Sequence, residues 1–140
     1  MSNFLSNFPS SRPRRLRKED WIRKLVQENK ISLEDLILPI FITYEKKSSL
    51  IKEMPNVYRY CLSDLVNIVY KAYEAGIRAI ALFPEVPPEK KDALGTEALN
   101  DENIICRAVR EIKKNIKEIG IICDVALDPY TLTGHDGRKN

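Results

Sequence analysis

Residues 121–137 read IICDVALDPYTLTGHDG. The stretch begins as an apolar run that Asp124 interrupts and Asp128 ends, and Asp136 follows in a loop flanked by glycines. A buried strand that delivers carboxylates at its C-terminal end is where parallel α/β proteins place their chemistry. We therefore expect a strand over 121–127 and a functional site directly after it.

Two further apolar runs precede this one. Residues 36–42 and 79–84 are apolar without alternation, as strands covered on both faces are. Pro39 cannot donate to a ladder, so we expect a bulge or an irregular first strand there. Asp35 and Ser32 have the spacing of a capping box, which predicts one helical turn just before the first strand.

Amphipathic helices are predicted between the strands. Apolar residues recur at helical spacing over 62–73, where Ser63 is the expected N-cap and Gly76 the expected end. A second helix is expected to begin at an Asn100 cap and to end at Gly120. Alternating strands and helices predict an α/β fold with parallel pairing and right-handed crossovers.

The connections divide into two kinds. Residues 44–60 are expected to be a polar connection, and residues 85–99 a polar loop rich in proline. At that length an unstructured loop is more often functional or flexible than a plain connector. Because the loops after parallel strands open on one face, this loop and the acidic stretch should be neighbours.

Composition describes one ordinary globular domain. The chain has 140 residues, 44% hydrophobic and 31% charged, with a net charge of +3. That charge does not argue for nucleic acid, and no apolar run approaches the roughly 20 residues of a membrane span. Three widely spaced cysteines indicate reduced thiols and a cytoplasmic protein rather than a disulfide framework or a zinc knuckle.

The N-terminal part differs in character. Residues 12–18 hold five basic residues in seven, and a short helix capped by Asp20 should follow. We favour a solvated or subunit-wrapping tail over a nucleic-acid arm, since aromatic residues are scarce there. The expected organisation is an arm with a short helix over 1–30 and a second domain over 31–140.

The carboxylates are the best candidates for chemistry. In a strand over 121–127, alternation puts Asp124 and Asp128 on one face with Ala126 between them. Such a pair could hold a hard cation or orient a substrate amine, and the alternative is a plain turn at Asp128. His135 is the sole histidine and is expected to be a loop residue. No apolar site for a Schiff-base lysine is evident.

These residues resemble the porphobilinogen synthase family, also called delta-aminolevulinic acid dehydratase. The motifs that carry the resemblance follow the family's order and cover nearly everything from Arg12 to Gly137. They are RPRRLR at 12–17, DLILPIF at 35–41, MPNVYR at 54–59, AIALFP at 79–84, DVALDPYT at 124–131 and GHDG at 134–137.

The resemblance implies the N-terminal part of a (β/α)8 TIM barrel, about three βα units, preceded by an extended arm. It implies a homo-oligomer, commonly an octamer, assembled through that arm. The implied reaction condenses two molecules of 5-aminolevulinate to porphobilinogen in haem biosynthesis, with Asp124 as a catalytic residue near the substrate amine.

The resemblance also indicates the metal. Family members with catalytic zinc carry three cysteines where this chain has Ala126, Asp128 and Asp136. This looks like the aspartate-rich class, which implies Mg²⁺ or K⁺ at Asp128 and Asp136 and no active-site zinc; carboxylates prefer such hard cations. Thr133 and Asn56 depart from the histidine and the glycine that are common in the family.

The length departs from the family as well. Its two Schiff-base lysines lie beyond the position that matches Asn140, so we expect a truncated chain that is inactive alone. The alternatives are a non-catalytic fragment that associates with a full-length relative, or another metal-dependent α/β lyase or aldolase.

Overall fold

The computed structural model describes residues 14–136. The chain divides into two compact units, residues 1–31 and residues 32–140. The predicted arm up to residue 13, with Arg12 of the basic run, and the segment from Gly137 onward lie outside the described residues. Within the described part, no helix has the length and apolar character needed to cross a bilayer.

The first unit contains two short helical segments, η1 (Arg15–Arg17) and α1 (Asp20–Leu25). The predicted Asp20 cap is wrong by one residue: Glu19 is the N-cap and makes no side-chain capping bond. Asp20 instead pairs with Lys24 at 2.7 Å and Arg23 at 3.3 Å, because residues three and four apart share a helix face. No residue of α1 is buried.

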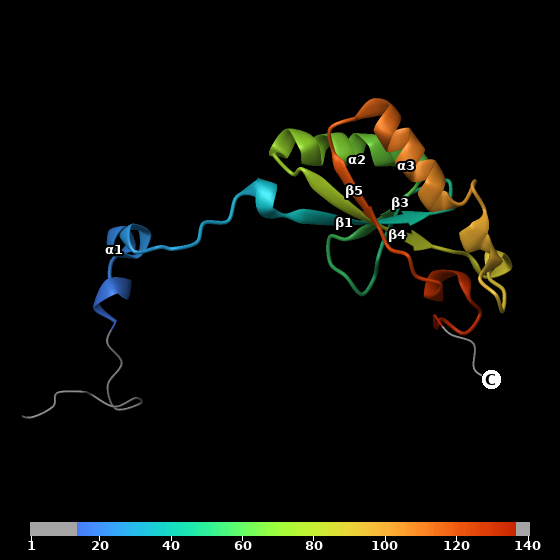
Figure 1. Ribbon diagram of the computed structural model, residues 1–140, viewed down its shortest axis with the longest axis horizontal. Helices are drawn as coiled ribbons and strands as arrows, with labels where there is room; N and C mark the ends of the chain where they lie inside the picture. Colours follow the sequence, from blue (N-terminus) through green and yellow to red (C-terminus); the bar gives the residue numbers. More distant parts are fainter. Residues whose placement is uncertain (1–13, 137–140) are drawn as a thin grey trace, which may run out of the picture. The chain divides into compact units, whose positions relative to one another are not determined.

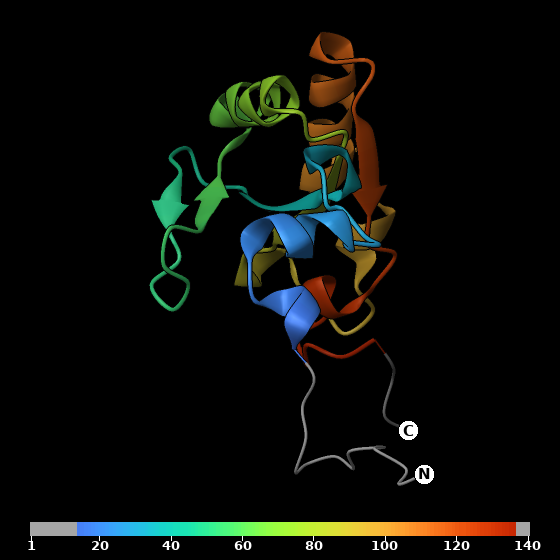
Figure 2. The same ribbon diagram turned by 90° about the vertical axis from the view of Figure 1, so that its left-hand side faces the viewer.

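The second unit is built on one five-stranded sheet. Its strands are β1 (Ile37–Thr43), β2 (Ser49–Leu50), β3 (Tyr58–Tyr60), β4 (Ala79–Glu85) and β5 (Gly120–Cys123). The order is β2-β3-β1-β4-β5, and only the β2–β3 pair is antiparallel. Figure 2 shows the β2–β3 hairpin at one edge and β5 at the other. The predicted parallel α/β architecture is confirmed, while the predicted plain connection at 44–60 is wrong, because it contains this hairpin.

Two helices, α2 (Leu62–Ala75) and α3 (Ile104–Asn115), cover one face of the sheet. Figure 1 shows them side by side above the strands. Between them and the sheet lies the hydrophobic core, built from alternate strand residues such as Ile40, Ile42, Ile80 and Leu82. The residues between these, including Phe41 and Phe83, therefore point to the opposite face.

Helix ends differ from the predictions at three places. Cys61, not Ser63, is the N-cap of α2, and Asn103, not Asn100, is the N-cap of α3. The Asn103 side chain accepts the Cys106 N–H at 2.9 Å, whereas Asn100 caps the preceding turn by accepting from Glu102. Gly76 ends α2 with φ +111°, as predicted, but α3 ends at Asn115 and Gly120 begins β5.

The first strand is regular. It pairs with β4 at all seven positions, so the expected bulge at Pro39 is wrong. On its other side β3 reaches only Phe41 and Ile42, so the missing N–H of Pro39 removes no bond to β3. The capping box of Ser32 and Asp35 is present as predicted, just before this strand.

Candidate active site

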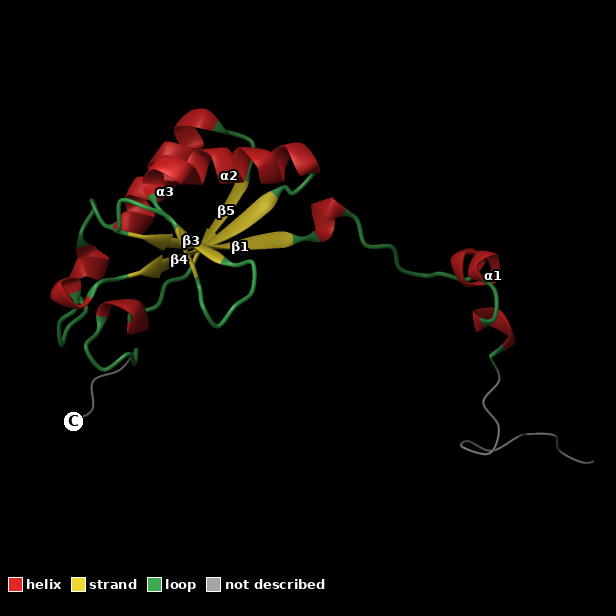
Figure 3. Cartoon of the chain, turned by 180° about the vertical axis from the view of Figure 1, so that it is seen from behind, coloured by secondary structure: helices red, strands yellow, loops and turns green. Residues whose placement is uncertain are grey.

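A pocket of about 240 Å³ opens at the C-terminal ends of β1, β4 and β5. In Figure 3 the loops that follow β4 and β5 lie on the same side of the sheet. The lining of the pocket combines an apolar wall from the strands with the acidic segment after β5. The residues are Phe41, Phe83, Pro84, Asp124, Ala126, Asp128, Pro129 and Tyr130.

Asp124 and Asp128 both line this pocket, although not by the predicted route. The strand ends at Cys123, so alternation over 121–127 does not hold. Asp124 follows the strand directly, and Asp128 begins the 3-10 turn η5 (Asp128–Tyr130). The chain thus bends after Cys123 and still brings both carboxylates to one pocket with Ala126.

The apolar wall is made by strand residues on the face away from the helices. The rings of Phe41 and Phe83, on neighbouring strands, lie 5.7 Å apart between centroids. Tyr130 is buried beside them, and burial raises the pKa of its phenol, which keeps it neutral. The pocket therefore sets two carboxylates against an apolar, partly water-excluding surface.

Asp136 has a structural task in the same segment. Its Oδ1 accepts the N–H of Leu127 at 2.6 Å and of Asp128 at 2.9 Å. The Thr131 hydroxyl donates to the His135 carbonyl at 3.0 Å and closes the same loop. Asp136 thus fixes the backbone that presents Asp128. His135 is exposed in this loop, as expected from the sequence.

The donor chemistry fits a hard cation. Asp124 and Asp128, which line the pocket, and Asp136 in the following loop offer only carboxylate oxygens, and no cysteine or histidine is among the described residues that line the pocket. Within residues 14–136, no group of three or more acidic, histidine or cysteine side chains is arranged to hold a metal ion. The two candidate ligands Asp128 and Asp136 belong to one loop, linked by the bond from the Asp128 amide.

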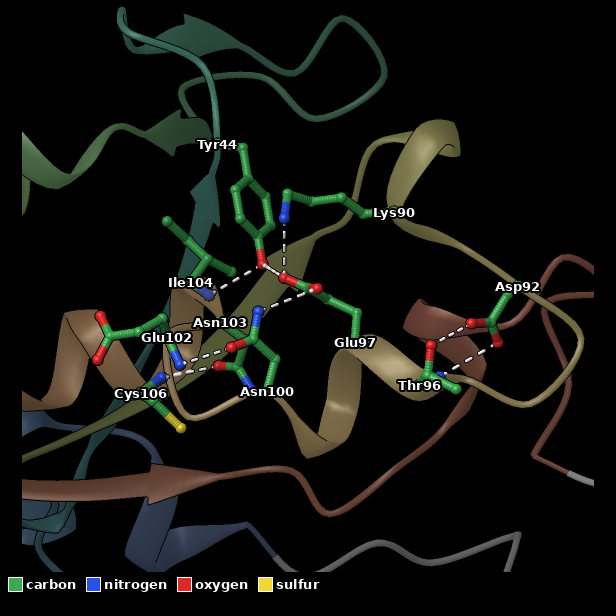
Figure 4. Close-up of polar contacts among 10 residues, drawn as sticks. All are labelled: Tyr44, Lys90, Asp92, Thr96, Glu97, Asn100, Glu102, Asn103, Ile104 and Cys106. Carbon is green, nitrogen blue, oxygen red and sulfur yellow. Dashed lines mark hydrogen bonds and ion pairs between the residues drawn. The ribbon is translucent and has the colours of Figure 1, made fainter.

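Sequence reasoning missed a polar network beside the pocket (Figure 4). The Tyr44 hydroxyl donates to Glu97 at 2.8 Å and accepts the N–H of Ile104 at 3.0 Å. Lys90 reaches the same Glu97 carboxylate at 3.1 Å. Only the length of the 85–99 loop hinted at it, because the partners are 53 and 60 residues apart.

The fold and the pocket define a parallel α/β protein built from barrel-type βα units, with an acidic site at the C-terminal ends of its strands. The family model of delta-aminolevulinic acid dehydratase matches residues 10–140. The chain belongs to this family.

Relatives agree with that assignment. The chain is 47% identical over 127 residues to delta-aminolevulinic acid dehydratase of Bradyrhizobium diazoefficiens, covering 90% of this chain and 36% of the relative. It is 42% identical over 129 residues to that of Chlamydia pneumoniae, covering 91% of this chain and 39% of the relative. The chain thus spans a little over a third of the length of these curated relatives.

A solved structure shares the fold. The crystal structure of delta-aminolevulinic acid dehydratase (porphobilinogen synthase) from Toxoplasma gondii, in complex with the reaction product porphobilinogen, superposes with a TM-score of 0.86. Its sequence is 39% identical, and the match covers 93% of this chain and 37% of that one. The partial TIM-barrel fold expected from the resemblance is therefore confirmed.

Proposed function

We propose that the protein contributes its pocket to the condensation of two 5-aminolevulinate molecules to porphobilinogen, with loss of two waters. The observation that carries the proposal is the meeting of Asp124 and Asp128 in one pocket at the C-terminal ends of parallel strands. The names of the relatives and the product complex of the Toxoplasma gondii protein support it.

The substrate has the chemistry that this pocket suits. 5-Aminolevulinate carries a cationic ammonium group at one end of a short chain. In the proposal, the Asp124 carboxylate binds that ammonium group and accepts a proton from it when the amine reacts. Phe41 and Phe83 supply an apolar wall that excludes water and strengthens the attraction between the charges.

For the metal we propose Mg²⁺ or K⁺ held by Asp128 and Asp136. The support is the oxygen-only donor set, which favours a hard cation over zinc. When bound, such an ion would supply positive charge that binds and polarises substrate oxygens. Asp136 would keep its two backbone bonds through Oδ1 and offer its other oxygen.

The assembly that we propose is a homo-oligomer, an octamer by the resemblance, formed through the N-terminal arm, in the cytoplasm. Support comes from α1, where Trp21 is 66% and Leu25 76% exposed, since large apolar side chains are more often covered. Several plant relatives are named as chloroplastic proteins.

The test is product formation from 5-aminolevulinate by the native protein purified from its source cells, as distinct from the 140-residue chain alone. Asp124→Asn keeps the side-chain shape and removes the charge, so we expect kcat to fall by about 100-fold or more. Asp101→Asn is the matched control, because that exposed residue lies outside the pocket, and it should leave kcat unchanged. Equal activity of Asp124→Asn and the native protein would overturn the role of Asp124. Turnover of other carbonyl substrates, but not of 5-aminolevulinate, would favour a different metal-dependent lyase.

A further inference from the structure

The segment that joins β4 to α3, residues 86–103, runs beside the loop that carries Asp128, and we call it the strap. It contains the 3-10 turns η3 (Pro88–Lys90) and η4 (Thr96–Leu99). We call residues 124–136, which follow β5, the acidic loop. In Figure 1 the strap lies beside η5, the 3-10 turn of the acidic loop, and contacts between η4 and η5 agree with that view. The strap is held at two separate places.

The first anchor is Glu97, whose side chain is only 12% exposed. Three donors converge on its carboxylate: the Tyr44 hydroxyl at 2.8 Å, Lys90 at 3.1 Å and Asn100 at 3.2 Å. The Lys90 ammonium also lies 4.9 Å from the centre of the Tyr44 ring. Figure 4 shows these groups gathered around one carboxylate. A buried charge with that many partners is fixed in place, because any departure leaves it unpaired.

Tyr44 makes this anchor rigid with respect to the sheet. It follows β1 directly, and its hydroxyl accepts the first N–H of α3, that of Ile104. Burial, then the hydrogen bond to Glu97, raises the pKa of Tyr44 far above its ordinary value, so the phenol stays a donor. The end of β1, the strap and the start of α3 are therefore tied at one point.

The second anchor joins the strap to the acidic loop. Asp92 forms a parallel bridge with Thr131: its N–H donates to the Tyr130 carbonyl at 3.2 Å, and its carbonyl accepts from Leu132 at 3.1 Å. The Asp92 carboxylate accepts the N–H of Leu94 at 2.8 Å and of Thr96 at 3.1 Å, which shapes the strap around the bridge. Gly95 has φ +67°, and a Cβ added there would lie 3.5 Å from the side chains of Leu127 and Thr131.

The acidic loop depends on this bridge for its position. Thr131, the bridged residue, donates from its hydroxyl to the His135 carbonyl, and Asp136 then holds the amides of Leu127 and Asp128. A chain of contacts thus runs from Glu97 through Asp92 and Thr131 to the backbone of Asp128.

We propose that Glu97 and Tyr44 are positioning residues that act through the strap: they hold the Asp92–Thr131 bridge in place and thereby fix the backbone that Asp136 braces and that presents Asp128 to the pocket. Their effect on turnover rests on the proposed function, whereas their effect on the loop does not.

Hydrogen exchange of the intact protein, followed by mass spectrometry, tests the proposal without requiring activity. Tyr44→Phe removes one hydroxyl and Glu97→Ala removes the carboxylate. Each should speed exchange of the amides in 127–132 by at least tenfold, while exchange in β1 and β4 stays unchanged. Glu97→Gln keeps an oxygen for the Tyr44 hydroxyl and should restore much of the protection. Glu89→Gln, an exposed glutamate of the same strap, is the matched control and should change nothing.

Two outcomes overturn the proposal. One is unchanged exchange in 127–132 in both Tyr44→Phe and Glu97→Ala; the other is faster exchange in the strap without faster exchange in 127–132. If Glu97→Ala also speeds hydrogen exchange in β1 and β4, that variant is too disruptive to be informative, and the comparison of Tyr44→Phe with Glu97→Gln tests the proposal. Kinetics separate the two proposals. Faster loop exchange in the variants, when the native protein makes no porphobilinogen, removes the proposed function and leaves the strap proposal. Faster loop exchange in variants that also have a lowered kcat and an unchanged KM supports both.

Discussion

The carboxylates around the pocket divide into two groups by what they contact. Asp124 and Asp128 face the pocket, and their carboxylates accept none of the hydrogen bonds found within residues 14–136. Asp92 and Asp136, in contrast, each accept two backbone N–H groups and shape the loops. Free carboxylates can bind a cation or an amine, while bonded ones supply rigidity, so charge alone does not separate the two roles.

Acid is predicted to loosen the strap through Asp92. Hydrogen bonds from the Thr96 side chain, then from the Thr96 and Leu94 amides, lower the pKa of Asp92 below its ordinary value of 3.8. Because the folded pKa is the lower one, the stabilisation is complete above pH 3.8 and is lost as the pH falls through the folded pKa. In an NMR titration the Leu94 and Thr96 amide shifts should therefore move with a midpoint below 3.8. In Asp92→Asn they should not titrate; a midpoint at or above 3.8 in the native protein would contradict the assignment.

Metal affinity should depend on Asp128. If Asp128 and Asp136 hold Mg²⁺ or K⁺, Asp128→Asn removes one anionic ligand and should weaken Mg²⁺ binding by at least about tenfold, as loss of a charged ligand does. Calorimetric titration of the native protein with MgCl₂ measures this directly. Asp101→Asn, outside the pocket, provides the comparison and should bind as the native protein does. Equal affinities in all three proteins would remove Asp128 from the site.

At the scale of the elements, Gly76 at the end of α2 packs against the turn before β1, and replacing it should lower stability. Gly76 has φ +111°, and a Cβ added there would lie 3.3 Å from the Leu33 side chain. Gly76→Ala should lower the free energy of unfolding by about 1–3 kcal/mol, because a residue with a Cβ is strained in this backbone conformation. Gly134→Ala is the matched control: its φ is +67°, but a Cβ would meet nothing within 4 Å. Urea unfolding should show the larger loss for Gly76→Ala; the reverse order would mean that the Leu33 contact relaxes freely.

The elements also show what the sequence could predict. Strands β1 and β4 and helix α2 follow from long apolar patterns, and Gly76 marks the end of α2 as expected. The hairpin of β2 and β3 was missed because its strands have two and three residues, too few for a pattern. The start of α3 was misplaced because the side chains of Asn100 and Asn103 both accept backbone N–H groups, and the sequence alone does not show which of them begins the helix.

The candidate site was predictable only where its residues form a local pattern in the sequence. Asp124 and Asp128 stand out as acidic residues at the end of an apolar run, and they do line one pocket. The contacts that tie the strap to the rest of the unit, Tyr44 with Glu97 and Asp92 with Thr131, join residues far apart in the sequence, so no local pattern could indicate them. The prediction that Asp136 binds metal stays a prediction, and its bonds to two amides add a structural role that spacing alone did not suggest.

In the second unit as a whole, the two faces of the sheet differ. The helices cover one face, and the other carries Phe41 and Phe83 together with Ile122, which is 47% exposed. In barrels of this type that second face is the interior, filled by side chains from further strands. The pocket lies at the C-terminal end of this face, so residues contributed from beyond the 140-residue chain would complete its walls in the proposed enzyme.

That arrangement predicts how the 140-residue chain behaves alone with substrate. The family resemblance implies two lysines that form Schiff bases, yet no lysine is among the described residues that line the pocket. Lys90 is paired with Glu97 at 3.1 Å and is not among the residues that line the pocket. Incubation of this chain with 5-aminolevulinate and borohydride, which reduces a Schiff base to a stable adduct, should therefore leave its mass unchanged and yield no porphobilinogen. The longer Bradyrhizobium diazoefficiens relative, treated in parallel, should gain the mass of the adduct. An adduct on the 140-residue chain, mapped to a lysine by digestion, would show that this segment supplies a nucleophile itself and that the pocket needs no lysine from elsewhere.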